Sequence, residues 1–298
     1  MSQQTFPPGV IGLHALPADH HDGPWDSMIV PPGTKERLLA TAVLVLRQGR
    51  LLTGLSSAPH GLIVLAGPPG TGKTTLAQGL AQAAALKMAP RGATTLVEVN
   101  PHAFPSDMLG ESQRAVSRLF SNTLPEIAAR RPHTIVLIDE IEALAVRRST
   151  ASFETNPVDV HRATDAVLAG LDQLRAACPH LVLVTTTNFI QAVDEAVLSR
   201  ADLVLATTLP DEAAVVAIVA SSLAELAGQW PALVTLARDA ALHAELARGL
   251  VGLDGRRVRK TILSALMRRT EVALDPSLLT ADELRHAVRE AADIVPAA

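Results

Sequence analysis

The stretch that decides the fold is GPPGTGKTT, residues 67–75. The run before it, Leu62–Ala66, is continuously apolar, as expected of a parallel strand that is covered on both faces. The run after it, residues 76–85, is rich in helix-forming residues. The quoted stretch is therefore predicted to be the loop between a buried strand and a helix.

The spacing of the glycines and of the Lys-Thr pair in this loop is that of a P-loop. Glycines let backbone N–H groups point inward around a phosphate, and the positive end of the following helix dipole favours the same anion. We expect Lys73 to reach the β- and γ-phosphates of ATP and the Thr74 hydroxyl to bind Mg²⁺. A glycine-rich surface turn is the alternative, but the flanking strand and helix argue against it. The predicted nucleotide-binding loop comprises Gly67, Pro68, Pro69, Gly70, Thr71, Gly72, Lys73, Thr74 and Thr75.

The composition is that of a protein with a large core and no disulfide framework. The 298 residues are 48% hydrophobic, and Cys178 is the single cysteine, which fits a reducing compartment. Residues 1–4 lack the charge and apolarity of a signal peptide, and the apolar run over 38–46 is too short to span a membrane. We expect a cytoplasmic protein without a membrane partner.

The charge balance argues against direct binding to nucleic acid. The net charge is −4, and the chain has no tyrosine and few other aromatic residues on which bases could stack. The histidines lack the spacing of a zinc site. Neither nucleic-acid binding nor zinc chemistry is expected.

A second apolar segment, residues 135–138, runs into Asp139 and Glu140, which is a Walker B pattern. We expect Asp139 to hold Mg²⁺ through its water shell and Glu140 to orient and polarise the attacking water. The alternative is an acidic pair that caps the helix beginning near Ile141, a common arrangement in isolation. The P-loop favours the catalytic interpretation.

Two further polar residues lie next to predicted strands: Asn188 follows one, and Arg200 precedes another. Asn188 comes after the apolar strand 181–184, and a polar residue at a strand's carboxyl end is placed to sense the γ-phosphate. Taken alone, an asparagine after Thr-Thr-Thr more often forms a turn. Arg200 lies between a short helix, 194–199, and a strand, 203–206. It forms either a local salt bridge or an arginine finger that enters the ATP site of a neighbouring subunit, which requires an oligomer.

Past Pro210 the chain becomes alanine-rich, which predicts a second, helical domain with helices over 211–226, 232–248, 255–269 and 280–292. The last helix opens with a capping-box spacing, Thr280 and Glu283. Arg256 and Arg259 lie in the first turns of the third helix, where the dipole disfavours cations. Either ATP phosphate supplies their counter-anion, or they form a solvated basic face.

In this order the motifs resemble Walker A, Walker B, sensor 1, arginine finger and sensor 2 of an AAA+ ATPase. The segments WDSMIV (25–30), DEAVLSRAD (194–202) and GLDGRRVRK (252–260) are similar to those of the pachytene-checkpoint AAA+ ATPases, which remodel HORMA-domain proteins. The resemblance covers the chain from residue 23 to its end. It implies an α/β fold: a flexible tail over 1–24, an AAA+ domain with a parallel five-stranded sheet over 25–208, and a smaller helical lid domain over 209–298.

The resemblance also implies site residues. The segment that contains Asp26 and Ser27 would pack beside the adenine, and Arg256 and Arg259 match the sensor 2 arginines. The pore loop would lie within 105–112, where relatives place an aromatic residue and this chain has Met108 and Leu109. These two either grip substrate by apolar contact or pack within their own loop. A second pore loop, or a disordered insertion, would fall at 147–152.

The resemblance further implies a homohexamer that pulls the N-terminal segment of a HORMA protein into its pore and converts the closed form to the open one. About two dozen residues precede Trp25, too few for the N-terminal domain of eukaryotic relatives. The chain thus resembles bacterial members that accompany HORMA proteins and cyclic-oligonucleotide synthases in antiphage signalling. Such an ATPase would take the HORMA–synthase complex apart and restrain the defence.

Two other functions remain open at the level of sequence. One is a different AAA+ machine, such as a protease-associated unfoldase or a clamp-loader-like DNA protein, the latter disfavoured by the negative net charge. The other is a scaffold that binds ATP to assemble and hydrolyses little. Glu140 argues against the scaffold, because a scaffold does not need a carboxylate that activates water.

Overall fold

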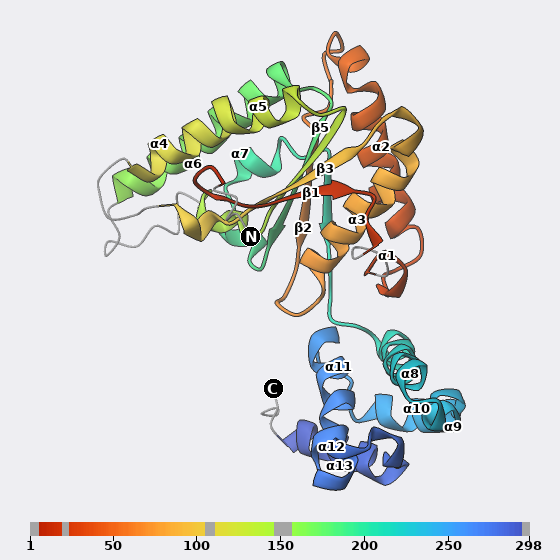
Figure 1. The fold of residues 1–298 in the computed structure, drawn as a ribbon. Coiled ribbons are helices and arrows are strands. Elements are labelled where there is room, and N and C mark those ends of the chain that lie inside the picture. Colours follow the sequence, from red (N-terminus) through yellow and green to blue (C-terminus); the bar gives the residue numbers. More distant parts are fainter. Residues whose placement is uncertain (1–5, 20–23, 105–110, 146–156, 294–298) are drawn as a thin grey trace. The chain divides into compact units, whose positions relative to one another are not determined.

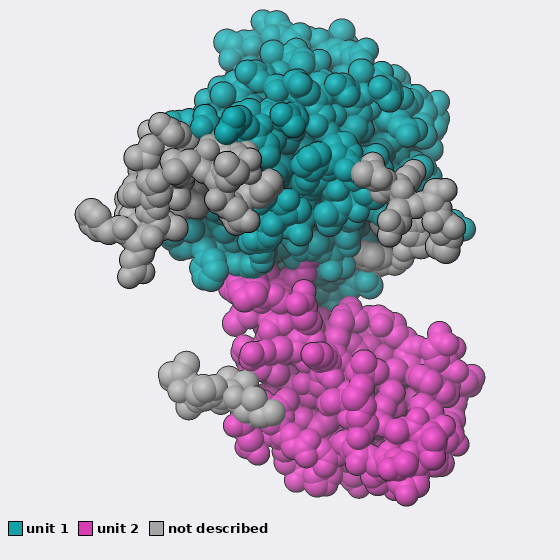
Figure 2. Space-filling model, turned by 60° about the vertical axis from the view of Figure 1, so that its left-hand side comes forward, with its two compact units in different colours: residues 1–67, 73–207 teal, residues 68–72, 208–298 magenta. Residues whose placement is uncertain are grey.

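The computed structural model describes residues 6–19, 24–104, 111–145 and 157–293 (Figure 1). The chain divides into two compact units, residues 1–67 with 73–207 and residues 68–72 with 208–298 (Figure 2). The expected pore residues Met108 and Leu109 and the expected second pore loop, 147–152, lie outside the described residues.

The first unit, called unit 1, is built on a six-stranded sheet with the order β1-β3-β4-β5-β2-β6. Strands β2 to β6 pair in parallel, which confirms the five parallel strands expected from the sequence. A sixth strand, β1, pairs antiparallel with β3 at one edge. The strands are β1 (Val10–Leu16), β2 (Leu62–Ala66), β3 (Thr94–Val99), β4 (His133–Ile138), β5 (Leu181–Thr187) and β6 (Leu203–Ala206).

Strand β1 lies within the segment that was expected to be a flexible tail, and the expectation is wrong for residues 10–16. Val10 pairs with Val99 and Leu16 with Thr94, and both β1 residues are buried. The strand covers the edge of β3, which would otherwise present unpaired backbone groups. Its pairing partner is distant in the sequence, so the local composition, with its Pro, Gly and His residues, did not reveal it.

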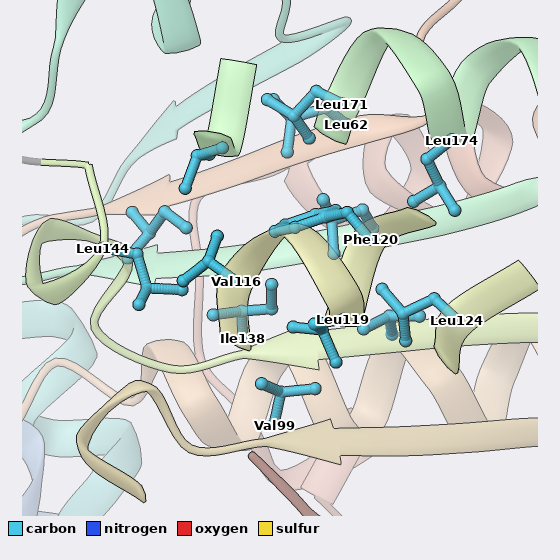
Figure 3. Packing of buried hydrophobic residues seen from close by; sticks show 14 of the residues in the cluster. Leu62, Val99, Val116, Leu119, Phe120, Leu124, Ile138, Leu144, Leu171 and Leu174 are labelled. Carbon is cyan, nitrogen blue, oxygen red and sulfur yellow. The ribbon is translucent and has the colours of Figure 1, made fainter. Parts of the chain in front are cut away.

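Helices cover both faces of this sheet, which is why its strands are apolar throughout (Figure 1). In β2, Leu62 and Val64 join the cluster on one face, while Ile63 and Leu65 join the cluster on the other. The first of these clusters is centred on Phe120, which is fully buried (Figure 3). One face is covered by α2 (Thr34–Leu52) and α3 (Lys73–Met88), the other by α4 (Glu111–Arg118), α5 (Leu124–Ala129) and α6 (Pro157–Ala177).

The second unit, called unit 2, contains helices and, in its described residues, no strand. The expected capping box is confirmed: the Thr280 N–H donates to Glu283 Oε2 at 2.8 Å, and the Glu283 N–H donates to Thr280 Oγ1 at 3.4 Å. The helices are α8 (Glu212–Gln229), α9 (Val234–Arg238), α10 (Ala240–Arg248), α11 (Gly255–Ser264), α12 (Thr270–Leu274) and α13 (Ala281–Asp293).

Helix α8 is the one helix in the described part of the chain whose length and hydropathy would also suit a membrane span. It packs against α9, α10 and α11 within unit 2. Its residues Val215, Val219 and Leu223 are fully buried there. One face of this apolar helix therefore belongs to the core of the helical unit, and 28% of the helix is buried.

The close approach of α2 to the loop before β5 requires glycine at position 49. A Cβ atom at Gly49 would lie 1.8 Å from the carbonyl oxygen of Pro179. We expect Gly49→Ala to destabilise the protein by about 1–3 kcal/mol, although alanine is the better helix former by about 1 kcal/mol. The measurement is denaturant-induced unfolding followed by circular dichroism.

Gly228 in α8 is the matched control, because a Cβ atom there would meet nothing within 4 Å. Gly228→Ala should be neutral or stabilising by up to about 1 kcal/mol. Equal effects of the two substitutions would contradict the packing argument.

Candidate active site

Three loops of unit 1 leave the sheet at the same edge, after β2, β4 and β5. The three strands are parallel and β5 lies between the other two. Their carboxyl ends therefore meet, which is where open α/β sheets bind ligands. The loop after β2 leads to Lys73, the loop after β4 begins with Asp139 and Glu140, and the loop after β5 begins with Asn188.

Lys73, the first residue of α3, is 6% exposed and is held by two oxygen atoms. Its Nζ donates to the Gly67 carbonyl oxygen at 2.7 Å and to Asn188 Oδ1 at 2.8 Å. Burying an ammonium group is costly unless it is hydrogen-bonded, so these acceptors stabilise it inside the loop. A phosphate oxygen would be a stronger, charged acceptor for the same group.

The glycines of the loop are required by its backbone. Gly67 has φ 151°, and a Cβ atom there would lie 2.1 Å from the carbonyl oxygen of Thr207, which follows β6. Gly72 has φ 85°, in the left-handed region that favours glycine. Between them, residues 68–72 are grouped with unit 2. The nucleotide-binding role of the nine loop residues stays a prediction.

Asp139 follows β4 and accepts hydrogen bonds from two hydroxyl groups. Thr74 Oγ1 donates to Asp139 Oδ1 at 2.9 Å, and Thr186 Oγ1 donates to the same oxygen. Hydroxyl and carboxylate oxygens are the hard ligands that suit Mg²⁺. The two expected metal ligands, Thr74 and Asp139, are thus brought together by the fold.

Glu140 is the one residue other than glycine, among the described residues, that has a positive φ, with φ 58° and ψ 58°. This backbone conformation costs an L-residue roughly 1–2 kcal/mol, so it persists only where the surroundings impose it. Here the Glu140 N–H donates to Thr186 Oγ1 at 3.0 Å. The turn separates the directions of two adjacent carboxylates, so that Asp139 contacts Thr74 while Glu140 contacts Asn188.

Asn188 links the two halves of the site. Its Nδ2 donates to Glu140 Oε1 at 3.0 Å, while its Oδ1 accepts from Lys73. Its own N–H donates to Glu142 Oε1 at 3.0 Å. An amide side chain can donate and accept at once, which suits a position between an ammonium group and a carboxylate.

Sequence reasoning missed three residues at this site: Thr186, Glu142 and His102. Thr186 bridges Asp139 and Glu140, and the Thr-Thr-Thr run before Asn188 marked its position without showing which hydroxyl faces the site. His102, which follows β3, has its Nε2 3.0 Å from Glu140 Oε2. No local pattern distinguished Glu142 or His102.

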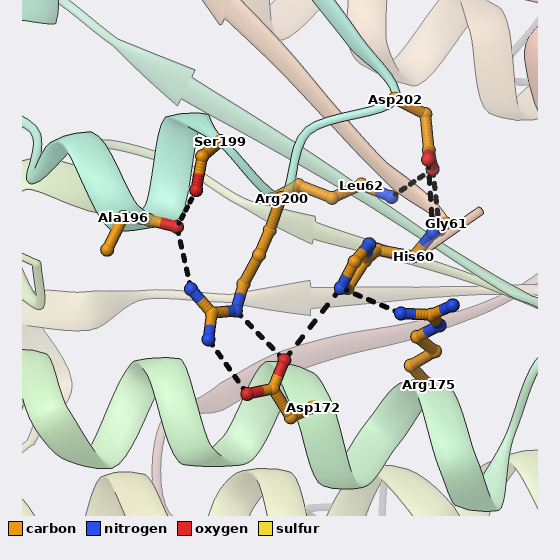
Figure 4. Close-up of polar contacts among 9 residues, drawn as sticks. All are labelled: His60, Gly61, Leu62, Asp172, Arg175, Ala196, Ser199, Arg200 and Asp202. Carbon is orange, nitrogen blue, oxygen red and sulfur yellow. Dashed lines mark hydrogen bonds and ion pairs between the residues drawn. The ribbon is translucent and has the colours of Figure 1, made fainter. Parts of the chain in front are cut away.

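Arg200 lies at the opposite ends of the strands, near the start of β2. Asp202, two residues later, accepts hydrogen bonds from the N–H groups of Gly61 and Leu62, at the start of β2, at 2.7 and 3.0 Å (Figure 4). The P-loop begins at the other end of β2, five residues and about 17 Å further along. An arginine side chain does not span this distance, so the structure does not bring Arg200 to the Lys73 site of its own chain.

Arg200 does form the local salt bridge that was one of its two interpretations. Its Nε and Nη2 donate to the two carboxylate oxygens of Asp172 at 2.9 and 2.8 Å, and Nη1 donates to the Ala196 carbonyl oxygen at 2.9 Å (Figure 4). The hydrogen bond from Arg200 holds the pKa of Asp172 below its ordinary value. The same bond raises the pKa of Arg200, so both groups are charged at neutral pH.

The segment with Asp26 and Ser27 forms α1 (Pro24–Ser27), which packs against α3 in unit 1. A Cβ atom on Gly79 of α3 would lie 2.8 Å from the backbone nitrogen of Trp25. The Nζ of Lys35 donates to the Asp26 carbonyl oxygen at 3.3 Å and lies 5.8 Å from the centre of the Trp25 ring. The adenine contacts of Asp26 and Ser27 stay a prediction.

The expected sensor 2 arginines lie on α11 of unit 2. The Arg259 Nη1 is 3.0 Å from Glu225 Oε1, so a carboxylate of α8 serves as a counter-anion. The Arg256 N–H donates to the Gly70 carbonyl oxygen at 3.3 Å, a bond between residues grouped in unit 2. Their contact with ATP also stays a prediction.

Thr186→Val tests the bridge from the Asp139 carboxylate to the Glu140 backbone N–H, because it removes the hydroxyl and keeps the shape. Hydrogen bonds to charged groups contribute about 1.5–3 kcal/mol, so we expect kcat for ATP hydrolysis to fall roughly ten- to a hundredfold. The measurement is steady-state phosphate release.

Thr185→Val is the matched control on the adjacent residue of β5. The Thr185 hydroxyl is buried and has no hydrogen-bond partner within the described parts of the chain. Its removal should leave kcat unchanged and stability equal or higher. A Thr186→Val enzyme as active as this control would show that the bridge has no catalytic role.

Comparison with known proteins places this chain in a family. Residues 63–209 match the family described as "ATPase family associated with various cellular activities (AAA)". The chain is 43% identical to CD-NTase-associated protein 6 of Pseudomonas aeruginosa, over 97% of this chain and 94% of that protein. It is 32% identical to the pachytene checkpoint protein 2 homolog of Danio rerio, over 93% of this chain and 70% of that protein.

Solved structures agree in fold. The structure of C. elegans PCH-2 superposes with a TM-score of 0.76 at 25% identity and covers 96% of this chain and 76% of that one. A chain of the E. coli MS115-1 HORMA:CdnC:Trip13 complex has a TM-score of 0.73 at 20% identity and covers 97% and 96%, respectively. The chain is therefore an AAA ATPase, and it belongs to the family of the pachytene checkpoint protein 2 homologues and CD-NTase-associated protein 6.

Proposed function

We propose that this chain is an ATP-driven remodeller that converts a HORMA-domain protein from its closed to its open form. In this role it takes apart the complex of that protein with a cyclic-oligonucleotide synthase and restrains antiphage signalling. The observation that carries the proposal is the 43% identity, along nearly the whole chain, to a CD-NTase-associated protein. The fold shared with a chain of a HORMA:CdnC:Trip13 complex supports it.

The arrangement of charges supports a division of catalytic roles. Lys73 and the P-loop bind the phosphates of ATP, and Glu140 orients the attacking water and accepts its proton. Asn188 holds Lys73 and Glu140 at a fixed separation. When bound at Thr74 and Asp139, Mg²⁺ neutralises charge on the phosphates. Asp26, Ser27, Arg256 and Arg259 complete the proposed nucleotide site.

The position of Arg200 supports a site shared between copies of the chain. Phosphoryl transfer is accelerated strongly by an arginine that neutralises charge in the transition state. Arg200 lies at the edge of the sheet opposite its own P-loop, so it serves the ATP bound by a neighbour. A closed ring, here a hexamer, gives every site such a neighbour.

The work that the proposed function demands explains the need for hydrolysis. Opening a closed domain means unfolding part of it against a stability of roughly 5–15 kcal/mol. Repeated cycles of hydrolysis supply that work. We propose that residues 25–208 and 209–298 form the ATPase and helical lid domains of this machine, and that it acts in the cytoplasm.

Glu140→Gln separates binding from hydrolysis. This variant should bind ATP and retain the HORMA protein while its hydrolysis falls by about a hundredfold or more, because the water loses its base.

Lys73→Ala should lose nucleotide binding, because it removes the buried cation of the loop. The measurements are nucleotide binding by fluorescence, phosphate release, and co-elution with a HORMA-domain protein from the same genome.

The substrate class needs its own measurement. The unmodified protein with ATP should release the HORMA protein from its synthase and should leave an unrelated folded protein intact. Equal unfolding of both substrates would instead indicate a general unfoldase. Unchanged hydrolysis in Glu140→Gln would remove the catalytic role of that residue.

A further inference from the structure

The guanidinium of Arg200 is fixed by three hydrogen bonds, and two of its N–H donors remain unused within the described part of the chain. Three of its five N–H donors are used, by the two oxygens of Asp172 and by the Ala196 carbonyl (Figure 4). The two that remain have no hydrogen-bond partner among the described residues. The side chain is 25% exposed. The group is thus fixed in direction and still able to donate to a further anion.

The elements around Arg200 explain how it is held. Arg200 follows α7 (Glu195–Leu198), and its Nη1 donates back to the carbonyl oxygen of Ala196, the second residue of that helix. Asp172 comes from the last turns of α6, which covers the face of the sheet that packs against the cluster around Phe120. Two separate elements therefore fix the guanidinium, and two N–H···O bonds in one plane set its orientation as well as its position.

Among the described neighbours of Asp172, Arg200 is the one that forms its close ion pair. His60 is the other neighbour, with Nε2 3.8 Å from Asp172 Oδ1 and 3.3 Å from Arg175 Nη1. Burial, and then Arg175, lower the pKa of His60, so its ring is neutral at neutral pH. Arg200 is therefore the cation that forms both strong bonds to Asp172.

This pair has a consequence besides its contribution to stability. The Asp172 side chain is 51% exposed, so water screens part of what the pair contributes to folding. Orientation is a different matter, because a free arginine side chain loses rotamer freedom when it reaches a phosphate. A side chain that is already held in place loses less, so it stabilises a transition state more effectively.

We propose that Asp172 is a positioning residue that orients Arg200 toward the phosphates of ATP bound by a second copy of this chain. The proposal rests on the proposed function, in which Arg200 acts across an interface. Asp172 does not touch the nucleotide; it acts through Arg200. The two donors that it leaves unused are those offered to the phosphate.

Asp172→Asn is the decisive variant, because it keeps the size of the side chain and removes one of the two acceptors. We expect kcat for ATP hydrolysis to fall about ten- to a hundredfold, the effect of a misplaced catalytic group, while KM changes less than about twofold. ATP binding, measured by fluorescence, and ring assembly, measured by sedimentation, should both stay as in the unmodified protein. Asp172→Glu, which keeps a carboxylate, should recover part of the loss.

Glu245→Gln is the matched control. Glu245 forms the same bidentate pair with Arg285 in unit 2, at 2.8 and 3.0 Å, and is 43% exposed. Its replacement changes a bidentate ion pair that belongs to the other unit and does not include Arg200. We expect kcat to stay within about twofold of the unmodified value, as for exposed pairs in general.

A double-mutant cycle separates positioning from damage to the fold. Because Asp172 acts through Arg200, adding Asp172→Asn to Arg200→Ala should cause no further loss of hydrolysis. A further loss of the same size, or loss of ATP binding in Asp172→Asn alone, would show a structural role and overturn the proposal. So would full activity of Asp172→Asn.

The Arg200→Ala variant also distinguishes this proposal from the one on which it rests. If Arg200→Ala loses hydrolysis by about a thousandfold while Asp172→Asn is fully active, the proposal that Arg200 acts in trans is supported and the proposal for Asp172 is overturned. If Arg200→Ala hydrolyses ATP normally, both fall together.

Discussion

The chemistry of this protein depends on one constraint, the order of three parallel strands. With β5 between β4 and β2, the residue that leaves β5 must lie between the P-loop lysine and the Walker B carboxylates. Asn188 occupies that place and bonds to Lys73 on one side and to Glu140 on the other. In another strand order the same residues would be separated by a strand width of about 4.8 Å or more.

The sequence contained much of this site but not its internal contacts. The P-loop, Asp139, Glu140 and Asn188 were found because each follows an apolar run, and the five parallel strands were expected for the same reason. Thr186 was missed because alternation along a strand decides which of three adjacent threonines faces the site, and that register depends on tertiary pairing. Strand β1 was missed because only its contact with β3 makes it a strand.

The role of Arg200 shows a second limit. Its sequence context allowed a salt bridge or a trans-acting arginine, and the two were treated as alternatives. The structure shows the salt bridge with Asp172, yet the bridge leaves donors unused and places the group at the far edge of the sheet. The two interpretations are therefore compatible, because a local ion pair can prepare an arginine for a distant phosphate.

The left-handed backbone at Glu140 has a consequence for the engineering of this chain. Glycine and asparagine tolerate that conformation better than glutamate, so either would relieve the turn while removing the carboxylate that we propose as the base. A collection of variants selected for heat resistance alone would therefore enrich for inactive ones at this position.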